Sequence, residues 1–276
     1  MTKIVLREEL LDYWSAENAF DHIRKIEGEI AKAKDNRRVI KFELNDRTYY
    51  LKHHVGIGWK EYFKNIFQLK MPVLGASNEW YAIERLMPTE IPVMTAVAFG
   101  QQGLNPANQE SFLVTRELEN TLSLEKLCET WKQSPPSYKL KKALIERVAV
   151  IARIMREQGL NHRDFYICHM LLDISQGRDN IDPSALRLYL VDLHRMQLRR
   201  RVPKRWLIKD IGSLYFSAAH IGLTKRDIVH FIRSYESYGN RQSVRGLLSS
   251  SFWRGVNKRT YKLHRKDFSC DPVLPL

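Results

Sequence analysis

Cysteine is scarce in this chain, and long apolar runs are missing from it. The 276 residues include three widely separated cysteines, Cys128, Cys168 and Cys270. Their odd number and spacing fit neither a disulfide framework nor a zinc site, and they indicate a reducing, cytoplasmic setting. No apolar run approaches the roughly 18 residues that a membrane-spanning helix needs. Because acidic residues occur within the first ten positions, we expect no signal peptide.

Acidic residues are also rare in the last third of the chain. Residues 196–276 hold 17 Lys and Arg against 5 Asp and Glu, whereas residues 1–195 hold 28 against 26. This asymmetry indicates either an anionic partner or a solvated basic surface. Because no zinc finger, RNP motif or basic-aromatic repeat is present, we expect no nucleic-acid partner.

Alternating apolar residues predict a strand-rich first part. The expected strands lie within residues 36–54, which turn at Asn45-Asp46, and at residues 93–100 and 111–118. Residues 28–34 fit either a strand or a short helix. One principal helix is expected at residues 78–87, ending before Pro88.

A helix-rich part follows. Apolar residues recur with a period of 3.6 from Leu140 to Met155, and Gly159 is the expected left-handed cap of that helix. Two Leu-rich strands, "HMLLDI" and "LRLYLVDL", come next, and further helices are expected at about residues 209–219 and 224–235. The sequence therefore predicts an α+β fold with two lobes, residues 1–117 and residues 118–276.

The segment "GLNHRDFYICHMLL" (159–172) carries the most informative motif. His162-Arg163-Asp164 matches the start of the catalytic loop in phosphotransferases with the protein-kinase fold. In that role Asp164 accepts the proton of the acceptor hydroxyl, while His162 and Arg163 shape the loop. Where a protein kinase has a metal-binding asparagine, this chain has His169.

Other parts of an ATP site occur in the expected order. Lys52 ends a predicted strand and is placed to contact the ATP phosphates, and Glu79 on the following helix is a candidate partner for it. Asp192 follows a predicted apolar strand, where a carboxylate is placed to bind Mg²⁺. Each residue alone is more often a surface charge or a turn residue, so the argument depends on their combination.

Longer strings resemble the lipopolysaccharide core heptose(I) kinases of Gram-negative bacteria, a branch of the protein-kinase-like superfamily. They lie across most of residues 36–230: "GIGWKEYFKNIFQLKMPVLGASNEWYAI", "NHRDFYICHMLL", "VDLHRMQLR" and "VPKRWLIKDIGSLYFSAAHIGLTKRD". The resemblance implies a bilobal protein-kinase-like fold. It also implies transfer of the ATP γ-phosphate to the first heptose of the inner core, at O-4, with ATP and Mg²⁺ as cofactors.

The resemblance also assigns roles to residues. It makes Asp164 the catalytic aspartate, Asp192 the metal ligand, and Lys52 with Glu79 the ion pair of the small lobe. It places Glu117 and Leu118 at the lobe junction, where backbone groups bind adenine, and it makes Asp210 a brace for the catalytic loop. The implied substrate is heptosylated Kdo-lipid A on the cytoplasmic face of the inner membrane, where the enzyme is expected to be a peripheral protein.

Two basic segments are candidates for anionic contacts. The run "LRRRVPKRW" suits the acidic Kdo sugars, the lipid A phosphates or the membrane surface, and it contains Arg199, Arg200, Arg201, Lys204 and Arg205. A helix expected at about residues 59–69 fits either a membrane-surface helix or a helix that buries its aromatic residues in the small lobe.

The chain departs from protein kinases in three places. A Gly-x-Gly-x-x-Gly loop is absent from the first hairpin, so Arg37 or Lys34 is a candidate cover for the phosphates. Leu193-His194 replaces the usual Phe-Gly, and no activation segment ending in Ala-Pro-Glu is visible. These features favour a constitutive small-substrate kinase. The alternatives are a protein kinase, an aminoglycoside-type phosphotransferase, and a non-enzymatic basic protein that binds nucleic acid or membrane.

His169 is not expected to replace the missing asparagine as a metal ligand, because Mg²⁺ prefers oxygen ligands. We expect the imidazole to hydrogen-bond a phosphate oxygen, a metal-bound water or the Asp192 carboxylate instead.

Overall fold

The computed structural model describes residues 2–34, 36–56, 58–59, 75–103, 105, 108–236, 246 and 248–269, without the side chains of Lys32 and Lys34. The helix expected near residues 59–69 falls almost wholly outside these residues, as does Cys270. The chain forms two compact units. Unit 1 comprises Met1–Arg85, Met94–Leu118 and Leu193–Arg195, and unit 2 comprises Leu86–Val93, Glu119–Asp192 and Met196–Leu276.

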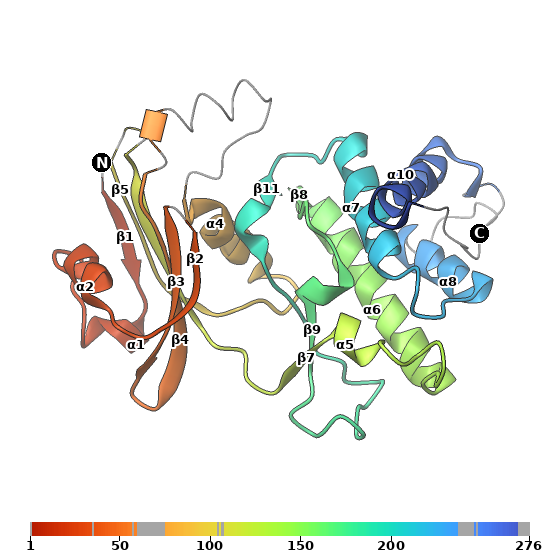
Figure 1. Ribbon diagram of the computed structural model, residues 1–276, viewed down its shortest axis with the longest axis horizontal. Coiled ribbons are helices and arrows are strands. Elements are labelled where there is room, and N and C mark those ends of the chain that lie inside the picture. Colours follow the sequence, from red (N-terminus) through yellow and green to blue (C-terminus); the bar gives the residue numbers. More distant parts are fainter. Residues whose placement is uncertain are drawn as a thin grey trace. The chain divides into compact units, whose positions relative to one another are not determined.

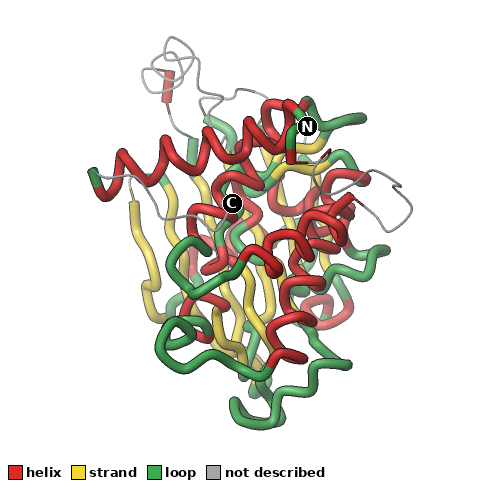
Figure 2. The backbone as a smooth tube through the Cα atoms, turned by 90° about the vertical axis from the view of Figure 1, so that its right-hand side faces the viewer, coloured by secondary structure: helices red, strands yellow, loops and turns green. Residues whose placement is uncertain are grey.

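Unit 1 is built on an antiparallel sheet (Figures 1 and 2). It has six strands in the order β1-β5-β6-β4-β3-β2. The strands are β1 (Lys3–Leu6), β2 (Glu29–Lys34), β3 (Arg37–Leu44), β4 (Arg47–His54), β5 (Ala96–Gln102) and β6 (Glu110–Arg116). Asn45 and Asp46 both have positive φ, as the two-residue turn between β3 and β4 requires. The segment 28–34, for which the sequence fitted either a strand or a short helix, is mostly strand β2.

Helices cover both faces of this sheet (Figure 1). They are α1 (Glu8–Leu11), α2 (Ala19–Lys25) and α4 (Ser77–Leu86). On one face Phe20 of α2 meets Phe112 edge-on, with ring centroids 5.1 Å apart, and on the other Trp80 of α4 stacks on Phe99 at the same separation. Because side chains alternate along a strand, Leu51 of β4 joins the α1–α2 core whereas Lys52 faces α4.

Unit 2 is mainly helical. Its helices are α5 (Leu124–Leu127), α6 (Tyr138–Glu157), α7 (Lys204–Ser217), α8 (Lys225–Glu236) and α10 (Ser251–Phe268). Ser137 caps α6 by accepting from the Leu140 amide, and the predicted apolar stripe of this helix is half-buried at Leu140 and buried from Leu144 to Met155. Close packing of α7 on α10 depends on Gly212, where an added Cβ would meet the Arg259 side chain at 2.6 Å.

Short strands of unit 2 carry the loops of interest. They are β7 (Thr121–Ser123), β8 (Leu160–Asn161), β9 (Met170–Asp173), β10 (Leu188–Leu190) and β11 (Gln197–Leu198), with 3₁₀ turns at Ile167–His169 and, in unit 1, at Leu193–Arg195. Sheet order is β10-β9-β7, and β11 pairs with β8. Gly159 has φ +72°, and an added Cβ there would lie 1.9 Å from the Arg199 carbonyl oxygen, so the cap residue must be glycine.

Several predicted boundaries were wrong. The strand predicted in "LRLYLVDL" is shorter than expected, Leu188–Leu190, and Asp192, which was predicted to follow the strand, has a left-handed backbone with φ +60°. Helix α7 begins at Lys204, five residues before the predicted start, directly after the extended Pro203. The elements β1, α1, α2 and α10 were not predicted.

Candidate active site

Within unit 1, Lys52 and Glu79 form a largely buried ion pair. The Lys52 Nζ lies 2.5 Å from Glu79 Oε1, and the two side chains are 14% and 1% exposed. Strand β4 fixes the lysine and helix α4, anchored by Trp80, fixes the glutamate. A buried carboxylate of this kind depends on its cation, because an uncompensated charge is costly in the protein interior. The contact predicted between these two residues is present.

Glu117 lies just after β6, and its side chain is committed to the sheet. The carboxylate accepts hydrogen bonds from Lys41 Nζ at 2.8 Å and from the Tyr50 hydroxyl at 3.1 Å. Burial opposes ionisation of Glu117, but these hydrogen bonds outweigh it and lower the pKa of the carboxyl group. The Glu117 amide donates to the Thr48 carbonyl, so its N–H is already used by the sheet.

Within unit 2, Asp210 holds the backbone of the segment His162-Arg163-Asp164. Its Oδ2 accepts from the His162 amide at 2.7 Å, and its Oδ1 accepts from the Arg163 amide at 2.9 Å. These contacts support Arg163 in a left-handed conformation with φ +75°. Asp164 is the next residue in the chain. Asp210 therefore fixes the backbone before Asp164, and neither of these two hydrogen bonds involves the Asp164 carboxylate.

Replacing Asp210 with asparagine should destabilise the protein, because the side-chain NH2 group only donates hydrogen bonds and would face a backbone amide that also donates. The expected loss is about 1–3 kcal/mol at pH 5. Burial raises the pKa of the Asp210 carboxyl to about 7, although the two amides favour the carboxylate. A carboxyl whose pKa rises on folding stabilises the fold below its unfolded pKa, and this contribution is lost as the pH rises toward 7. Denaturation measured from pH 5 to pH 8 should therefore show that the difference in unfolding free energy between wild type and Asp210→Asn becomes smaller as the pH rises. A constant or growing difference contradicts the account.

The buried His162 ring connects this loop to the segment before Asp192. Burial lowers the pKa of His162 to about 4, so the ring is neutral and its Nε2–H donates to the Val191 carbonyl at 3.0 Å. The Val191 amide donates in turn to the His169 carbonyl. Val191 is thus bonded to both ends of the loop, which holds Asp192 beside it.

His169 lies between the two aspartates. Its Nδ1 is 2.7 Å from the Asp164 carbonyl oxygen, and its Nε2 is 3.4 Å from Asp192 Oδ2. A carbonyl only accepts, so Nδ1 carries a hydrogen. The Nε2 atom faces the Asp192 carboxylate directly. The Asp192 carboxylate is one of the three partners that the sequence analysis considered.

The residues present fit a magnesium ion held partly by substrate. Asp192 offers a carboxylate that is 35% exposed, and in the described ranges no group of three or more His, Cys, Asp or Glu side chains could hold a metal. Mg²⁺ in nucleotide sites commonly uses one or two carboxylates together with phosphate oxygens and water rather than a full protein cage. Asp192 suits that arrangement.

The structure brings only some residues of the basic run together. Arg199 donates to Gln197 Oε1 at 2.6 Å, and Lys204 donates to Ser251 Oγ at 2.5 Å. The guanidinium groups of Arg199 and Arg205 lie 5.9 and 5.6 Å from the centre of the Trp206 ring. Arg200 and Arg201 are exposed. Sequence reasoning missed Trp206 and Lys209, although both lie in or beside the basic run.

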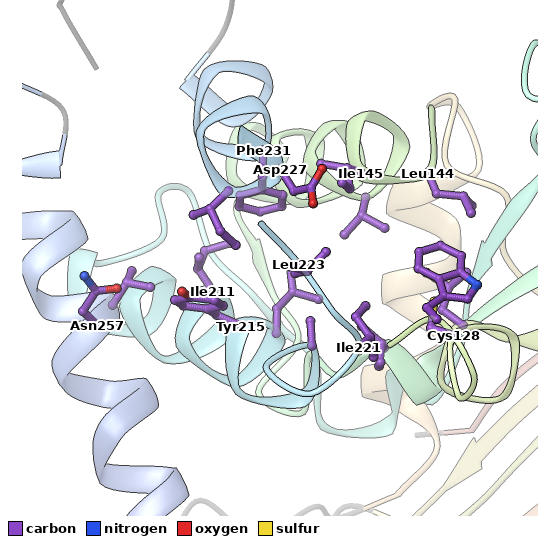
Figure 3. A pocket seen from close by; sticks show the side chains of 18 of the residues that line it. Cys128, Leu144, Ile145, Ile211, Tyr215, Ile221, Leu223, Asp227, Phe231 and Asn257 are labelled. Atoms are coloured by element: carbon purple, nitrogen blue, oxygen red, sulfur yellow. The ribbon is translucent and has the colours of Figure 1, made fainter. Parts of the chain in front are cut away.

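An apolar pocket lies elsewhere in unit 2, among α5, α6, α7, α8 and α10 (Figure 3). Its walls are almost entirely hydrocarbon and aromatic, and they include Trp131, Leu144, Ile211, Leu214, Phe231 and Trp253. The pocket was not predicted, because in the sequence its residues look the same as ordinary core residues.

Across the helices that the structure describes, none has both the length and the apolar character to cross a membrane.

Comparison with known proteins supplies the remaining findings. The "Lipopolysaccharide kinase (Kdo/WaaP) family" matches residues 21–235.

Two curated relatives are named lipopolysaccharide core heptose(I) kinase WaaP. The protein from Escherichia coli K12 is 44% identical over 233 residues, which is 84% of this chain and 86% of that protein. The protein from Pseudomonas aeruginosa is 40% identical over 264 residues, covering 96% and 97% of the two chains.

A solved structure of WaaP in complex with acyl carrier protein matches with a TM-score of 0.80 and 36% identity, over 95% of this chain and 99% of that one. This match confirms the predicted α+β, protein-kinase-like fold. The resemblance noted in the sequence is confirmed as well, and the chain belongs to the lipopolysaccharide kinase (Kdo/WaaP) family.

Proposed function

We propose that this protein transfers the γ-phosphate of ATP to the first heptose of the lipopolysaccharide inner core, at O-4. The observation that carries the proposal is the loop geometry of unit 2. There Asp210 fixes the backbone before Asp164, and His162 and His169 tie the same loop to Asp192. The kinase names of the relatives support the reaction, and their heptose substrate is the one proposed for this chain.

In this proposal residues 1–117 are the nucleotide-binding lobe and residues 118–276 the catalytic lobe. Lys52, held extended by Glu79, contacts the phosphates of ATP. Adenine binds backbone groups at Glu117 and Leu118. Because the Glu117 amide already donates to Thr48, the carbonyl of Glu117 is the group assigned to adenine. Arg37 is the remaining candidate to cover the phosphates.

Asp164 is assigned the proton transfer. The acceptor hydroxyl donates a hydrogen bond to its carboxylate, the hydroxyl oxygen forms a bond to the γ-phosphorus, and the bond from that phosphorus to the β-phosphate oxygen breaks. The proton passes to Asp164, and ADP leaves. His162, Arg163 and Asp210 hold the loop so that this carboxylate stays in place.

Asp192 is the residue that would hold Mg²⁺, which when bound neutralises charge on the ATP phosphates. His169 is assigned a supporting role, because its Nδ1 is committed to the Asp164 carbonyl and its Nε2 faces Asp192. It orients the Asp192 carboxylate from the side of the catalytic loop.

The acceptor is proposed to be heptosylated Kdo-lipid A at the cytoplasmic face of the inner membrane. The basic run would contact its acidic groups or the anionic membrane surface, through Arg199, Arg200, Arg201, Lys204 and Arg205. Basic side chains near an anionic membrane each contribute about 1 kcal/mol to binding.

ADP release tests this function. With ATP and Mg²⁺, the protein should release ADP rapidly when given heptosylated Kdo-lipid A and only at its background rate with the same lipid lacking heptose. Equal rates with the two lipids would contradict the substrate assignment.

The pocket of Figure 3 favours a second proposed property, binding of acyl carrier protein, since a related WaaP was solved in complex with that protein. Burial of an alkyl chain among apolar walls is favourable. We expect Ala218→Phe, which fills the pocket, to abolish co-elution with acylated carrier protein, whereas Arg226→Gln, at an exposed position of α8, leaves it unchanged. Equal co-elution of the acylated and acyl-free forms would show that the pocket is not used.

A further inference from the structure

Four cationic side chains surround the indole ring of Trp206. The Lys209 Nζ lies 4.1 Å from the ring centroid, and the guanidinium carbons of Arg205, Arg163 and Arg199 lie at 5.6, 5.8 and 5.9 Å. Cation–π attraction is modest for each such contact. One ring therefore cannot offset the mutual repulsion of the positive charges of Arg199, Arg205 and Lys209 around it.

The cations come from separate parts of unit 2. Arg163 belongs to the catalytic loop, Arg199 follows β11, and Arg205 and Lys209 lie on α7. A fifth positive charge, Arg259 of α10, also acts on Lys209. Burial lowers the pKa of the Lys209 ammonium, and the positive charges of Arg259, Arg205 and Arg163 lower it further. The cluster thus depends on tertiary folding.

The carboxylate that adjoins Lys209 in the chain, that of Asp210, is committed to backbone amides. Asp210 is 4% exposed, and both of its oxygens accept from the amides of His162 and Arg163. Its negative charge also acts on Lys209, but with less effect than burial and the three arginines, Arg259, Arg205 and Arg163. In the part of the chain that the structure describes, no acidic side chain forms an ion pair with Arg205, Lys209 or Arg259.

Arg199 is held in a fixed orientation. It donates to Gln197 Oε1 at 2.6 Å and to Asn161 Oδ1 at 3.4 Å, and both partners lie on the β8–β11 pair. These bonds use neutral amide oxygens, so they orient the guanidinium without neutralising it. The Arg199 guanidinium is therefore oriented before any ligand binds.

We infer that the Trp206 cluster is an oxyanion-binding subsite that takes a carboxylate or phosphate of the acceptor glycolipid, next to the sugar that is phosphorylated. This rests on the proposed function, because Arg163 directly precedes Asp164 and places the cluster beside the catalytic carboxylate. Guanidinium groups suit both oxyanions through paired hydrogen bonds. The two sources in the acceptor are the acidic Kdo sugars and the lipid A phosphates.

Binding can be measured without turnover. The chain has six tryptophans, so the Trp206 signal is the fluorescence difference between wild type and Trp206→Phe. Three probes are titrated separately: free Kdo, inorganic phosphate, and vesicles of phosphatidylethanolamine with phosphatidylglycerol. Saturable quenching by Kdo or by phosphate, weakened in Lys209→Met and unchanged in Arg226→Gln, supports the subsite and identifies its source. Quenching by vesicles alone assigns the cluster to the membrane surface and overturns the inference, as does the absence of any quenching.

Kinetics give an independent readout. Loss of one charge-assisted contact should raise the KM for the acceptor about tenfold in Lys209→Met, more than it lowers kcat, and leave the KM for ATP unchanged. A fall in kcat alone would overturn the inference. If wild type transfers no phosphate to heptose but Lys209 still controls Kdo or phosphate quenching, the proposed function fails while the subsite stands.

Discussion

Replacing Asp164 with asparagine is expected to lower kcat for phosphate transfer by roughly 10²–10⁴-fold, the range for loss of a general base. Asparagine keeps the shape of the side chain but cannot accept the hydroxyl proton at neutral pH. The KM for ATP should change little, since Asp164 is not assigned to the nucleotide.

The structure explains why this variant should remain folded. The loop is held by backbone groups, through Asp210 on the amides of His162 and Arg163 and through His169 on the Asp164 carbonyl. None of these bonds uses the Asp164 side chain. A matched control is Asp182→Asn, in an exposed turn, which should retain wild-type kcat. Full activity of Asp164→Asn in the ADP-release assay, with an unchanged melting temperature, would remove Asp164 from the mechanism.

Replacing Lys52 with methionine is expected to destabilise the protein by about 3–5 kcal/mol, the cost of leaving a buried charge without its partner. Glu79 is only 1% exposed, so water cannot take the place of the lysine. The double variant Lys52→Met/Glu79→Leu removes both charges and should regain most of this loss. Neither variant should transfer phosphate, because both lack the ammonium proposed for ATP.

Urea denaturation measures these changes, with Lys41→Met as the control. Lys41 pairs with Glu117, but those side chains are 34% and 22% exposed, so the expected loss of stability is far smaller than that of Lys52→Met. If Lys52→Met were no less stable than Lys41→Met, or if the double variant were less stable than the single one, the Lys52–Glu79 pair would not be the buried anchor described here.

Much of the fold could be predicted because local signals agreed with the tertiary structure. The Asn45-Asp46 turn joins two alternating strands, and α6 has a Ser137 cap, a regular apolar stripe and Gly159 beyond its end. The short helix α1 was missed because four residues show too little periodicity. Helix α10 was missed because its exposed face is rich in Lys and Arg and few apolar residues mark the buried one.

Some features of the candidate site could be predicted from the sequence and others could not. The residue types and order of Lys52, Glu79, Asp164 and Asp192 are visible in the chain, and Asp210 was placed by resemblance. The left-handed backbone of Asp192 and the hydrogen bond from His162 to Val191 could not be predicted from the sequence, because both depend on contacts between distant segments. The Trp206 cluster was missed for that reason too: its cations come from Arg163, Arg199 and two turns of α7.

The most direct test of the central claim is mass spectrometry of the acceptor after incubation with ATP and Mg²⁺. The account predicts that wild-type protein adds one phosphate to the first heptose of heptosylated Kdo-lipid A, and that fragmentation places it on that sugar. Phosphate on a protein side chain or on another sugar, or ATP consumed with an unchanged lipid, would contradict it.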